Sequence, residues 1–272
     1  MRDWSEAERR SARRIAFVPT MGFLHRGHLC LVRDAKARAD RLVVSIFVNP
    51  TQFGPGEDFL GYPRDFERDC ELLEKEGVHV LFHPSAAAMY PEGAQTNVEV
   101  KKLSLPLCGA QRAGHFRGVA TVVTKLFHIV RPHVAVFGEK DYQQLQVIHQ
   151  LVRDLNMSVE IVGHPIVRET DGLAMSSRNA YLTGAERTAA LCLSRAICRV
   201  ERLFKRGEVA ADALVRNALA ELEREPLARV EYVKLCDAAT LEEVDRVDEP
   251  AVLALAVHIG KARLIDNRVL AH

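Results

Sequence analysis

Two histidines, His25 and His28, lie directly after a short apolar run and before a predicted helix that begins near Leu29. An open α/β sheet presents its ligand crevice at this position, beyond the carboxyl end of a strand. Backbone amides at a helix N-terminus suit phosphate, and imidazole N–H groups can donate to triphosphate oxygens while the α-phosphorus is attacked. The pair therefore favours a nucleotide site. A solvated pair and a metal site remain alternatives, although a catalytic zinc takes three protein ligands.

A second segment, Gly138-Glu139-Lys140-Asp141, also follows a predicted strand and opens a helix. Lys140 would face the phosphates of a nucleotide there, assisted by the backbone amides of the turn. Gln144 lies one helical turn beyond Lys140 on the same face, where its amide offers a neutral donor and acceptor to a hydroxylated substrate. A capping turn with a solvated lysine is the alternative interpretation.

A third segment, Met175-Ser176-Ser177-Arg178, places two hydroxyls and a guanidinium in consecutive positions. Arginine binds phosphate in a bidentate way and serines add short donors, so the segment is typical of an anion cradle. An ordinary turn is the alternative.

Gln52 lies in a polar stretch, residues 49–53, immediately after the second predicted strand. A buried amide there is unfavourable without partners, so Gln52 is either satisfied within the chain or available to a substrate carboxylate or hydroxyl. Residues 115–118 fall in a predicted long loop. We interpret them as a mobile cover or an interface element, or, for Phe116, as a core anchor.

Short apolar runs alternate with amphipathic segments in the first part of the chain, which predicts βαβ units around a parallel sheet. The expected strands are residues 15–18, 42–48, 78–82, 134–137 and 159–162. The expected helices are residues 29–39, residues 65–76 and an apolar-faced segment that ends before Pro132. Stretches 49–63 and 84–118 are rich in turn formers and long enough to be binding loops. The prediction for residues 1–166 is a Rossmann-like α/β domain.

The pattern changes in the last third of the chain. One long amphipathic helix is expected over residues 184–206 and a second helix over 212–223, followed by strands at 230–235, 252–259 and 263–270. Helices followed by strands indicate a smaller α+β domain, which we place at residues 167–272.

Composition excludes several classes of protein. The net charge is +1, from 37 Lys and Arg against 36 Asp and Glu, so no global field favours nucleic acid or a membrane surface. The apolar runs are far shorter than the roughly 20 residues of a membrane helix. No G-x-G-x-x-G motif and no P-loop is present. Six cysteines without a C-x-x-C pair are expected to be free thiols, and we expect a cytoplasmic protein.

Six segments taken together resemble the pantothenate synthetases, the pantoate–β-alanine ligases of the nucleotidylyltransferase superfamily. Between Phe17 and Asn179 they read P-T-M-G-F-L-H-R-G-H, F-V-N-P-T-Q-F, Y-P-R, H-F-R-G-V, F-G-E-K-D-Y-Q-Q and G-L-A-M-S-S-R-N, in that order. The last third of the chain contains none of these motifs and resembles the family only in its general pattern of apolar and polar residues. Phe23 stands where the family often has a small residue, which removes no functional side chain.

The resemblance implies a reaction. Members of this family join D-pantoate to β-alanine and cleave ATP to AMP and pyrophosphate, through an enzyme-bound pantoyl adenylate. It also implies Mg²⁺ with the ATP phosphates, a homodimer, and a C-terminal domain that closes over the ATP site.

The resemblance further implies a role for each matched residue. The catalytic residues would be His28, His25, Lys140 and Arg178. Gln52 and Gln144 would hold pantoate and β-alanine, and Asp69 is a candidate for helping the metal ion. The ATP-binding residues would be Met21, Gly22, His25, His28, Gly138, Glu139, Lys140, Asp141, Val167, Met175, Ser176, Ser177 and Arg178.

Two rival functions are open at this point. A nucleotidylyltransferase of the same superfamily would transfer AMP to a phosphorylated acceptor, and it would need a cationic acceptor site in place of the neutral Gln52 and Gln144. A non-catalytic nucleotide-binding module would keep the fold, but the presence of all the expected phosphate-binding side chains argues against it.

Overall fold

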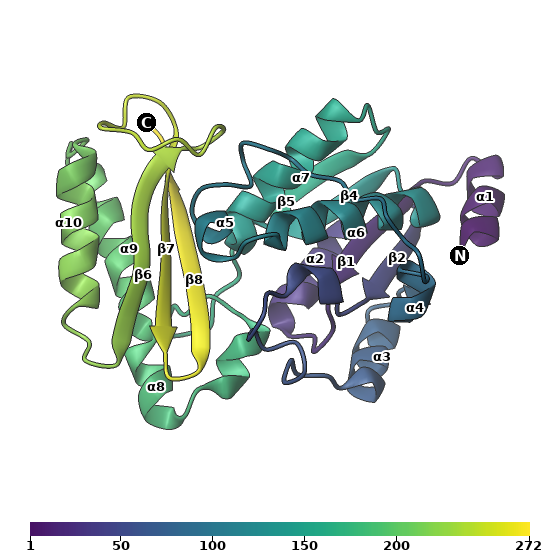
Figure 1. The fold of residues 1–272 in the computed structure, drawn as a ribbon, viewed down its shortest axis with the longest axis horizontal. Helices are drawn as coiled ribbons and strands as arrows, with labels where there is room; N and C mark the ends of the chain where they lie inside the picture. Colours follow the sequence, from purple (N-terminus) through teal and green to yellow (C-terminus); the bar gives the residue numbers. More distant parts are fainter. The chain divides into compact units, whose positions relative to one another are not determined.

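The structure is a computed structural model that describes residues 1–272, and the chain forms two compact units, Met1–Pro165 and Ile166–His272. In the first unit five parallel strands form one sheet in the order β3-β2-β1-β4-β5. The strands are β1 (Ile15–Thr20), β2 (Arg41–Ile46), β3 (Val80–Phe82), β4 (Val134–Gly138) and β5 (Glu160–His164). The predicted Rossmann-like parallel-sheet class is confirmed (Figure 1).

Burial differs between the centre and the edges of this sheet. The central strands β1, β2 and β4 are almost wholly buried, as expected of apolar strands covered on both faces. The edge strands β3 and β5 are only partly buried, and β3 begins at Val80, two residues after the predicted start. Short edge strands such as β3 present few unpaired backbone groups to other chains.

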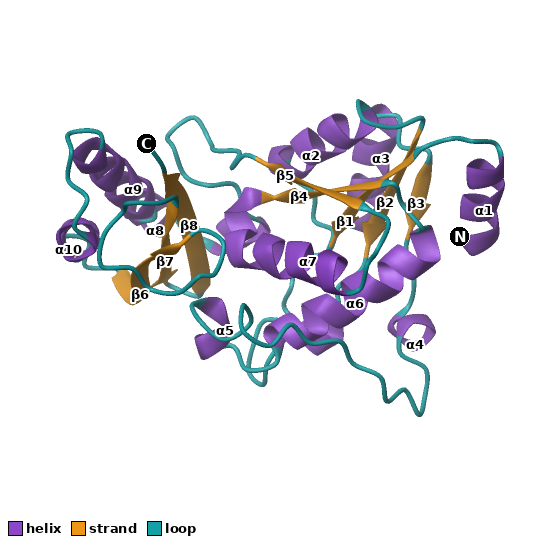
Figure 2. Cartoon of the chain, turned by 90° about the horizontal axis from the view of Figure 1, so that it is seen from above, coloured by secondary structure: helices purple, strands orange, loops and turns teal.

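Helices cover both faces of the sheet. Helices α2 (Arg26–Lys36) and α3 (Phe66–Lys75) lie on one face, and α6 (His115–Val130) and α7 (Tyr142–Asp154) lie on the other (Figure 2). Helix α6 ends at Val130, and its C-cap Arg131 has a positive φ of 50° one residue before Pro132, as the proline predicted.

The strand order creates a switch point between β1 and β4. The chain passes from β1 outward through β2 to β3, and then returns to the other side of β1 to form β4 and β5. Ligands of open α/β sheets bind beyond the carboxyl ends of the strands at such a point. A ligand site is therefore expected at the segments that follow β1 and β4.

The second unit is a three-stranded antiparallel sheet with helices on one face. Its strands are β6 (Ala228–Asp237), β7 (Ala251–Ile259) and β8 (Ala262–Leu270). Helices α9 (Leu191–Phe204) and α10 (Ala211–Leu222) pack against it through an apolar core that includes Leu193, Ile197 and Leu255 (Figure 1). The prediction of a single helix over residues 184–206 was wrong. At Ala190 φ is −58° and ψ is −19°, close to 3₁₀ values, and this tightened turn separates α8 (Gly184–Ala189) from α9.

Several short elements escaped sequence reasoning. They are the helices α1 (Arg2–Arg10), α4 (Ala86–Met89) and α5 (Cys108–Gln111), and the 3₁₀ turns η1 (Pro50–Gln52), η2 (Glu139–Asp141) and η3 (Ser177–Tyr181). Residues 115–118 do not form a mobile cover, because they are the first turn of α6, with His115 and Phe116 buried. Phe116 is a core anchor, the alternative left open above. None of the helices has the length and apolarity needed to cross a bilayer.

Candidate active site

The carboxyl edge of the parallel sheet brings together segments that are far apart in the sequence. Strand β1 pairs with β4 and β2, so the loops after these three strands leave the same edge. The Nε2 atom of Gln52, in η1 after β2, lies 3.2 Å from the sulfur of Met21, after β1. The charge of Lys140, after β4, acts on both His25 and His28. The predicted sites of the first unit are therefore one cluster.

His25 and His28 are joined in a capping box at the start of α2. His25 is the N-cap, and its Nδ1 accepts a hydrogen bond from the amide of Gly27 at 3.1 Å. The Nδ1 of His28 accepts from the amide of His25 at 3.3 Å, and the two rings lie 4.0 Å apart. Because each Nδ1 is an acceptor, a neutral ring carries its proton on Nε2. Both histidines thus present an N–H donor on the ring edge opposite the helix backbone.

The environment keeps these rings neutral. Burial and the charge of Lys140 lower the pKa of His25 from 6.5 to about 4. Burial, the neighbouring His25 ring and the charge of Lys140 also hold the pKa of His28 well below its usual value. A neutral imidazole is a donor that does not need to be desolvated as a charge before a polyphosphate approaches. The pair is therefore suited to hydrogen bonding and not to proton abstraction.

We predict that His25 stays uncharged through the physiological range. An NMR titration of its ring is expected to show a midpoint near pH 4, with the signal assigned by its loss in His25→Gln. The folded pKa lies below the unfolded value, so there is no penalty above pH 6.5, and stability falls as the pH drops from 6.5 toward 4. A midpoint at 6.5 would contradict the assignment of a buried neutral ring.

The loop between β1 and α2 is tied to α3 by Asp69. Gly22 has φ of +80°, and Phe23 also has a positive φ, of 50°. The consecutive amides of Phe23 and Leu24 each donate to a carboxylate oxygen of Asp69 at 2.7 Å. The Asp69 side chain is almost fully buried in this position. This geometry gives Asp69 a role in shaping the histidine loop, and its predicted part in metal binding stays a prediction.

Gly22 and Gly138 are predicted to respond differently to alanine. A Cβ on Gly22 would lie 2.9 Å from Ile46 Cγ2 and 3.1 Å from Asp69 Oδ2, at an unfavourable φ. Gly22→Ala is therefore expected to lower the free energy of unfolding by about 1–3 kcal/mol. A Cβ on Gly138 would meet only Leu31, at 3.9 Å, so Gly138→Ala is expected to stay within about 0.5 kcal/mol of wild type.

Urea denaturation of the two variants measures this difference. If Gly138 lies against a nucleotide, as predicted, Gly138→Ala will keep the stability of the wild type but raise the KM for ATP. Equal stability of the two variants would contradict the assigned loop geometry.

The segment after β4 presents one structural and one available glutamine. Gln143 is buried, and its amide binds the Cys108 amide and the carbonyls of Leu103 and Pro106. Gln144, the next residue of α7, is only partly buried and its side chain makes no hydrogen bond within the chain. Lys140 lies in η2 with its Nζ 3.7 Å from the carboxylate of Asp141. Gln144 is thus the amide that remains free to bind a ligand.

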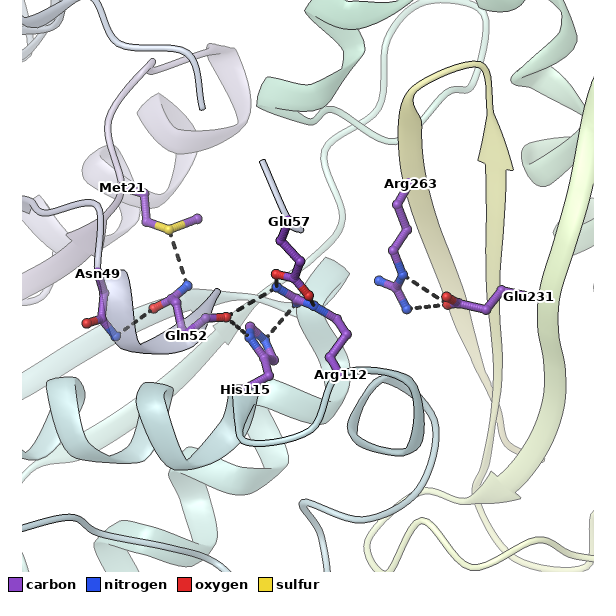
Figure 3. Close-up of polar contacts among 8 residues, drawn as sticks. All are labelled: Met21, Asn49, Gln52, Glu57, Arg112, His115, Glu231 and Arg263. Carbon is purple, nitrogen blue, oxygen red and sulfur yellow. Dashed lines mark hydrogen bonds and ion pairs between the residues drawn. The ribbon is translucent and has the colours of Figure 1, made fainter. Parts of the chain in front are cut away.

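Gln52 is buried and partly satisfied within the chain. Its Oε1 accepts from Asn49 Nδ2 at 3.1 Å, whereas its Nε2 has only the thioether of Met21 as a partner (Figure 3). Sulfur is a weak acceptor and the amide has two N–H groups, so a strong donor remains. Both alternatives left open for Gln52 therefore hold in part: the oxygen is used internally and the nitrogen is available.

In the second unit a small hairpin precedes the serine segment. Val167 and Met175 are paired across it, with the Met175 amide donating to the Val167 carbonyl at 3.0 Å. Ser176 caps η3 by accepting from the Arg178 amide at 3.2 Å, and Ser177 is buried.

The buried Asp266 of β8 anchors this hairpin. It receives a bidentate hydrogen bond from Arg168, with both distances 2.7 Å. Removing one partner of a buried ion pair is strongly destabilising, because it leaves the other charge buried and unpaired. The hairpin that leads into the predicted phosphate-binding residues is therefore fixed in place.

Comparison with known proteins now identifies the family. A sequence model of the family described as Pantoate-beta-alanine ligase matches residues 1–269. The chain belongs to this family. It is 57% identical to the pantothenate synthetase of Geotalea daltonii over 270 residues, which are 99% of this chain and 96% of that protein. The predicted family and enzyme class are thereby confirmed.

Solved structures of the ligase family agree with this assignment. Pantothenate synthetase from Thermus thermophilus has a TM-score of 0.92 and 47% identity, and 96% of each chain is covered. The pantoate-β-alanine ligase of Francisella tularensis, complexed with β-γ ATP and β-alanine, has a TM-score of 0.80 and 35% identity. The two structures match over 98% of this chain and 95% of the Francisella tularensis chain.

The ligase site also contains residues that sequence reasoning did not identify. Arg112 and Glu57 form a bidentate ion pair next to Gln52, although 55 positions separate them in the sequence. Tyr90 donates to Asn49 Oδ1 at 2.8 Å, and Asn49 in turn holds Gln52. Arg112, Glu57 and Tyr90 stand in stretches of turn formers without periodicity, so no local signal in the sequence predicts these contacts.

No cluster of three or more His, Cys, Asp or Glu side chains that could hold a metal ion is present in this ligase. Mg²⁺ is often held by one or two carboxylates together with substrate phosphates, and not by a cage of protein ligands. The residues present therefore fit an ion that arrives with a nucleotide better than a resident metal centre.

Proposed function

We propose that the chain condenses D-pantoate with β-alanine by first forming pantoyl adenylate from ATP, with release of pyrophosphate and then AMP. The observation that supports this most strongly is the pair of neutral imidazole donors at the switch point, next to the cation of Lys140. Family membership supplies the substrate class, and the donor arrangement suits charge that develops on phosphate oxygens.

In the first step a carboxylate oxygen of pantoate attacks the α-phosphorus of ATP, and the bond to the bridging oxygen of pyrophosphate breaks. The Nε2–H groups of His25 and His28 would donate to phosphate oxygens that gain charge in the transition state. Lys140 would add a positive charge to the same oxygens. No proton has to move in this step, which agrees with the low pKa of both histidines.

In the second step the free amine of β-alanine attacks the acyl carbon. An amide bond forms, AMP leaves with one of the former carboxylate oxygens, and the ammonium proton passes to solvent. Gln52 and Gln144 would orient pantoate through its hydroxyls and carboxylate, because both are neutral amides with donors unused in the chain. Gln52 would also meet β-alanine. A phosphorylated acceptor would require cationic residues in these places, which disfavours the nucleotidylyltransferase alternative.

We assign the remaining nucleotide contacts as follows. Ser176, Ser177 and Arg178 would bind phosphates, with Met175 beside them, and Asp141 and Val167 would lie near the ribose and adenine. Met21, Gly22, Gly138 and Glu139 would approach ATP from the loops after β1 and β4. Mg²⁺, when bound with ATP, would neutralise phosphate charge, and Asp69 is the residue predicted to help hold it. A homodimer and a cytoplasmic location are also proposed, the latter on six free thiols.

The test is pyrophosphate release from ATP, Mg²⁺ and pantoate, measured with and without β-alanine. We expect one equivalent of pyrophosphate per active site without β-alanine, and continuous turnover when β-alanine is added. Absence of pyrophosphate in both mixtures would overturn the adenylate mechanism. Stimulation by a phosphorylated acceptor, with none by β-alanine, would favour the alternative transferase.

A further inference from the structure

Arg112, which follows helix α5, is the centre of a partly buried polar cluster that the reaction above does not use. Its Nε and Nη2 donate to the two carboxylate oxygens of Glu57 at 2.8 and 2.7 Å. Its Nη1 lies 3.0 Å from His115 Nε2, and its Nη2 lies 3.4 Å from the carbonyl oxygen of Gln52 (Figure 3). These contacts occupy four of the five guanidinium N–H groups.

His115 links the same cluster to Gln52. Its Nδ1 lies 2.7 Å from the Gln52 carbonyl oxygen, which can only accept, so Nδ1 carries the proton. In a neutral ring Nε2 is then an acceptor and receives the N–H of Arg112. Burial and the charge of Arg112 lower the pKa of His115 to about 4, which agrees with this neutral form. The Gln52 carbonyl is therefore held by two donors with one consistent proton arrangement.

The side chain of Gln52 is fixed from the other direction. Asn49 Nδ2 donates to its Oε1, and Asn49 Oδ1 accepts from Tyr90 and Thr51, so the Asn49 amide cannot be flipped without losing these bonds. With Oε1 engaged, the Nε2 end of Gln52 is the part that faces Met21. Backbone and side chain are thus held at separate points.

We propose that Arg112 is a positioning residue for the hydroxy-acid substrate: it holds Gln52 in place through the Gln52 carbonyl and His115, and it fixes the adjoining loop through Glu57. The inference rests on the proposed contact between Gln52 and pantoate. The loop from residue 53 to residue 63 has no helix or strand of its own, and Glu57 is its ion-paired anchor. The Arg112 and Glu57 side chains are only 15% and 24% exposed, so the pair is poorly screened by solvent.

The chemistry requires arginine at this position. A lysine offers one nitrogen in place of a planar fork, so it cannot bind Glu57 in a bidentate way while it also contacts His115 and the Gln52 carbonyl. Loss of the Arg112 guanidinium fork would release Gln52 from this position. A misplacement of about 1 Å reduces catalytic efficiency by up to about 100-fold.

Steady-state kinetics of Arg112→Gln, Glu57→Gln and Gln52→Ala test the proposal. Arg112→Gln and Glu57→Gln are each expected to raise the KM for pantoate by about 10- to 100-fold. Their KM for ATP should stay within about twofold of wild type. A matched control is Arg33→Gln, which breaks another bidentate Arg–Glu pair of the same unit, between Arg33 and Glu76, and should leave both KM values unchanged.

A double-mutant cycle separates positioning from general stabilisation. In a Gln52→Ala background, Arg112→Gln should add less than about twofold to the KM for pantoate, because its effect passes through Gln52. Multiplicative effects, or equal changes in the KM values of ATP and pantoate, would overturn the proposal. If Arg112→Gln does not fold, Glu57→Gln, which removes only a charge, carries the same test.

The outcomes also separate this inference from the proposed function. If Gln52→Ala leaves the KM for pantoate unchanged, the proposed Gln52 contact is wrong. If Gln52→Ala raises that KM and neither Arg112→Gln nor Glu57→Gln does, the positioning role of Arg112 alone is wrong.

Discussion

His28→Ala is expected to reduce the rate of pyrophosphate release from ATP and pantoate by about 10²- to 10³-fold, as the loss of one preorganised transition-state donor does elsewhere. The ring presents Nε2–H because its Nδ1 is engaged by the His25 amide. His28→Gln carries an amide N–H at a position similar to Nε2, so it should retain more activity than alanine. Stopped-flow or quenched-flow measurement of the first turnover isolates this step.

The control for this prediction is His128→Ala, which changes an exposed histidine at the far end of α6. Loss of the capping bond in His28→Ala is expected to cost about 0.5–2 kcal/mol of stability, so the comparison is made well below the melting temperature. Wild-type pyrophosphate release by His28→Ala would remove this ring from the mechanism.

Lys140→Ala is expected to lower the same rate by about 10²-fold and to raise the KM for ATP, because the variant loses the cation that we propose acts on the α-phosphate. Lys140 is held in η2 directly after β4 and its charge already acts on both histidines. The Lys140 charge lowers the pKa of both histidines, and the alanine variant loses this contribution. The titration midpoint of His25 should therefore rise toward 6.5 in this variant.

Lys75→Ala, at an exposed position near the end of α3, is the matched control and should behave as wild type. Lys140→Arg keeps the charge on a longer and planar group, so partial activity is expected. An unchanged His25 titration together with unchanged kinetics in Lys140→Ala would contradict the assigned cluster.

Much of the first unit could be predicted from the sequence because its elements carry strong periodic signals. The buried strands β1, β2 and β4 are short runs of Val, Ile and Phe, and α6 has one continuous apolar face. The prediction failed where periodicity is absent or continuous across a break. The charged helix α1 has only two apolar residues, Trp4 and Ala7, too few to predict a helix, and the apolar face of residues 184–206 runs across the break at Ala190.

The site was predictable to a different extent. His25, His28, Lys140 and Gln144 could be placed because each follows a strand or opens a helix, and the carboxyl ends of parallel strands lie at one edge. The Arg112–Glu57 pair could not be placed, because tertiary contacts bring it together over 55 positions. Helical spacing from Lys140 singled out Gln144, but it could not show that the neighbouring Gln143 is buried and bonded to the loop at Leu103, because only the tertiary fold makes that contact.

The most direct test of the proposed adenylate is isotope transfer from pantoate labelled with ¹⁸O in its carboxylate. Attack of a carboxylate oxygen on the α-phosphorus, followed by aminolysis, leaves that oxygen on AMP. Mass spectrometry of AMP from a complete reaction with β-alanine should therefore show one ¹⁸O atom per molecule. Unlabelled AMP, with the departing ¹⁸O atom found in pyrophosphate, inorganic phosphate or water, would contradict an acyl-adenylate route.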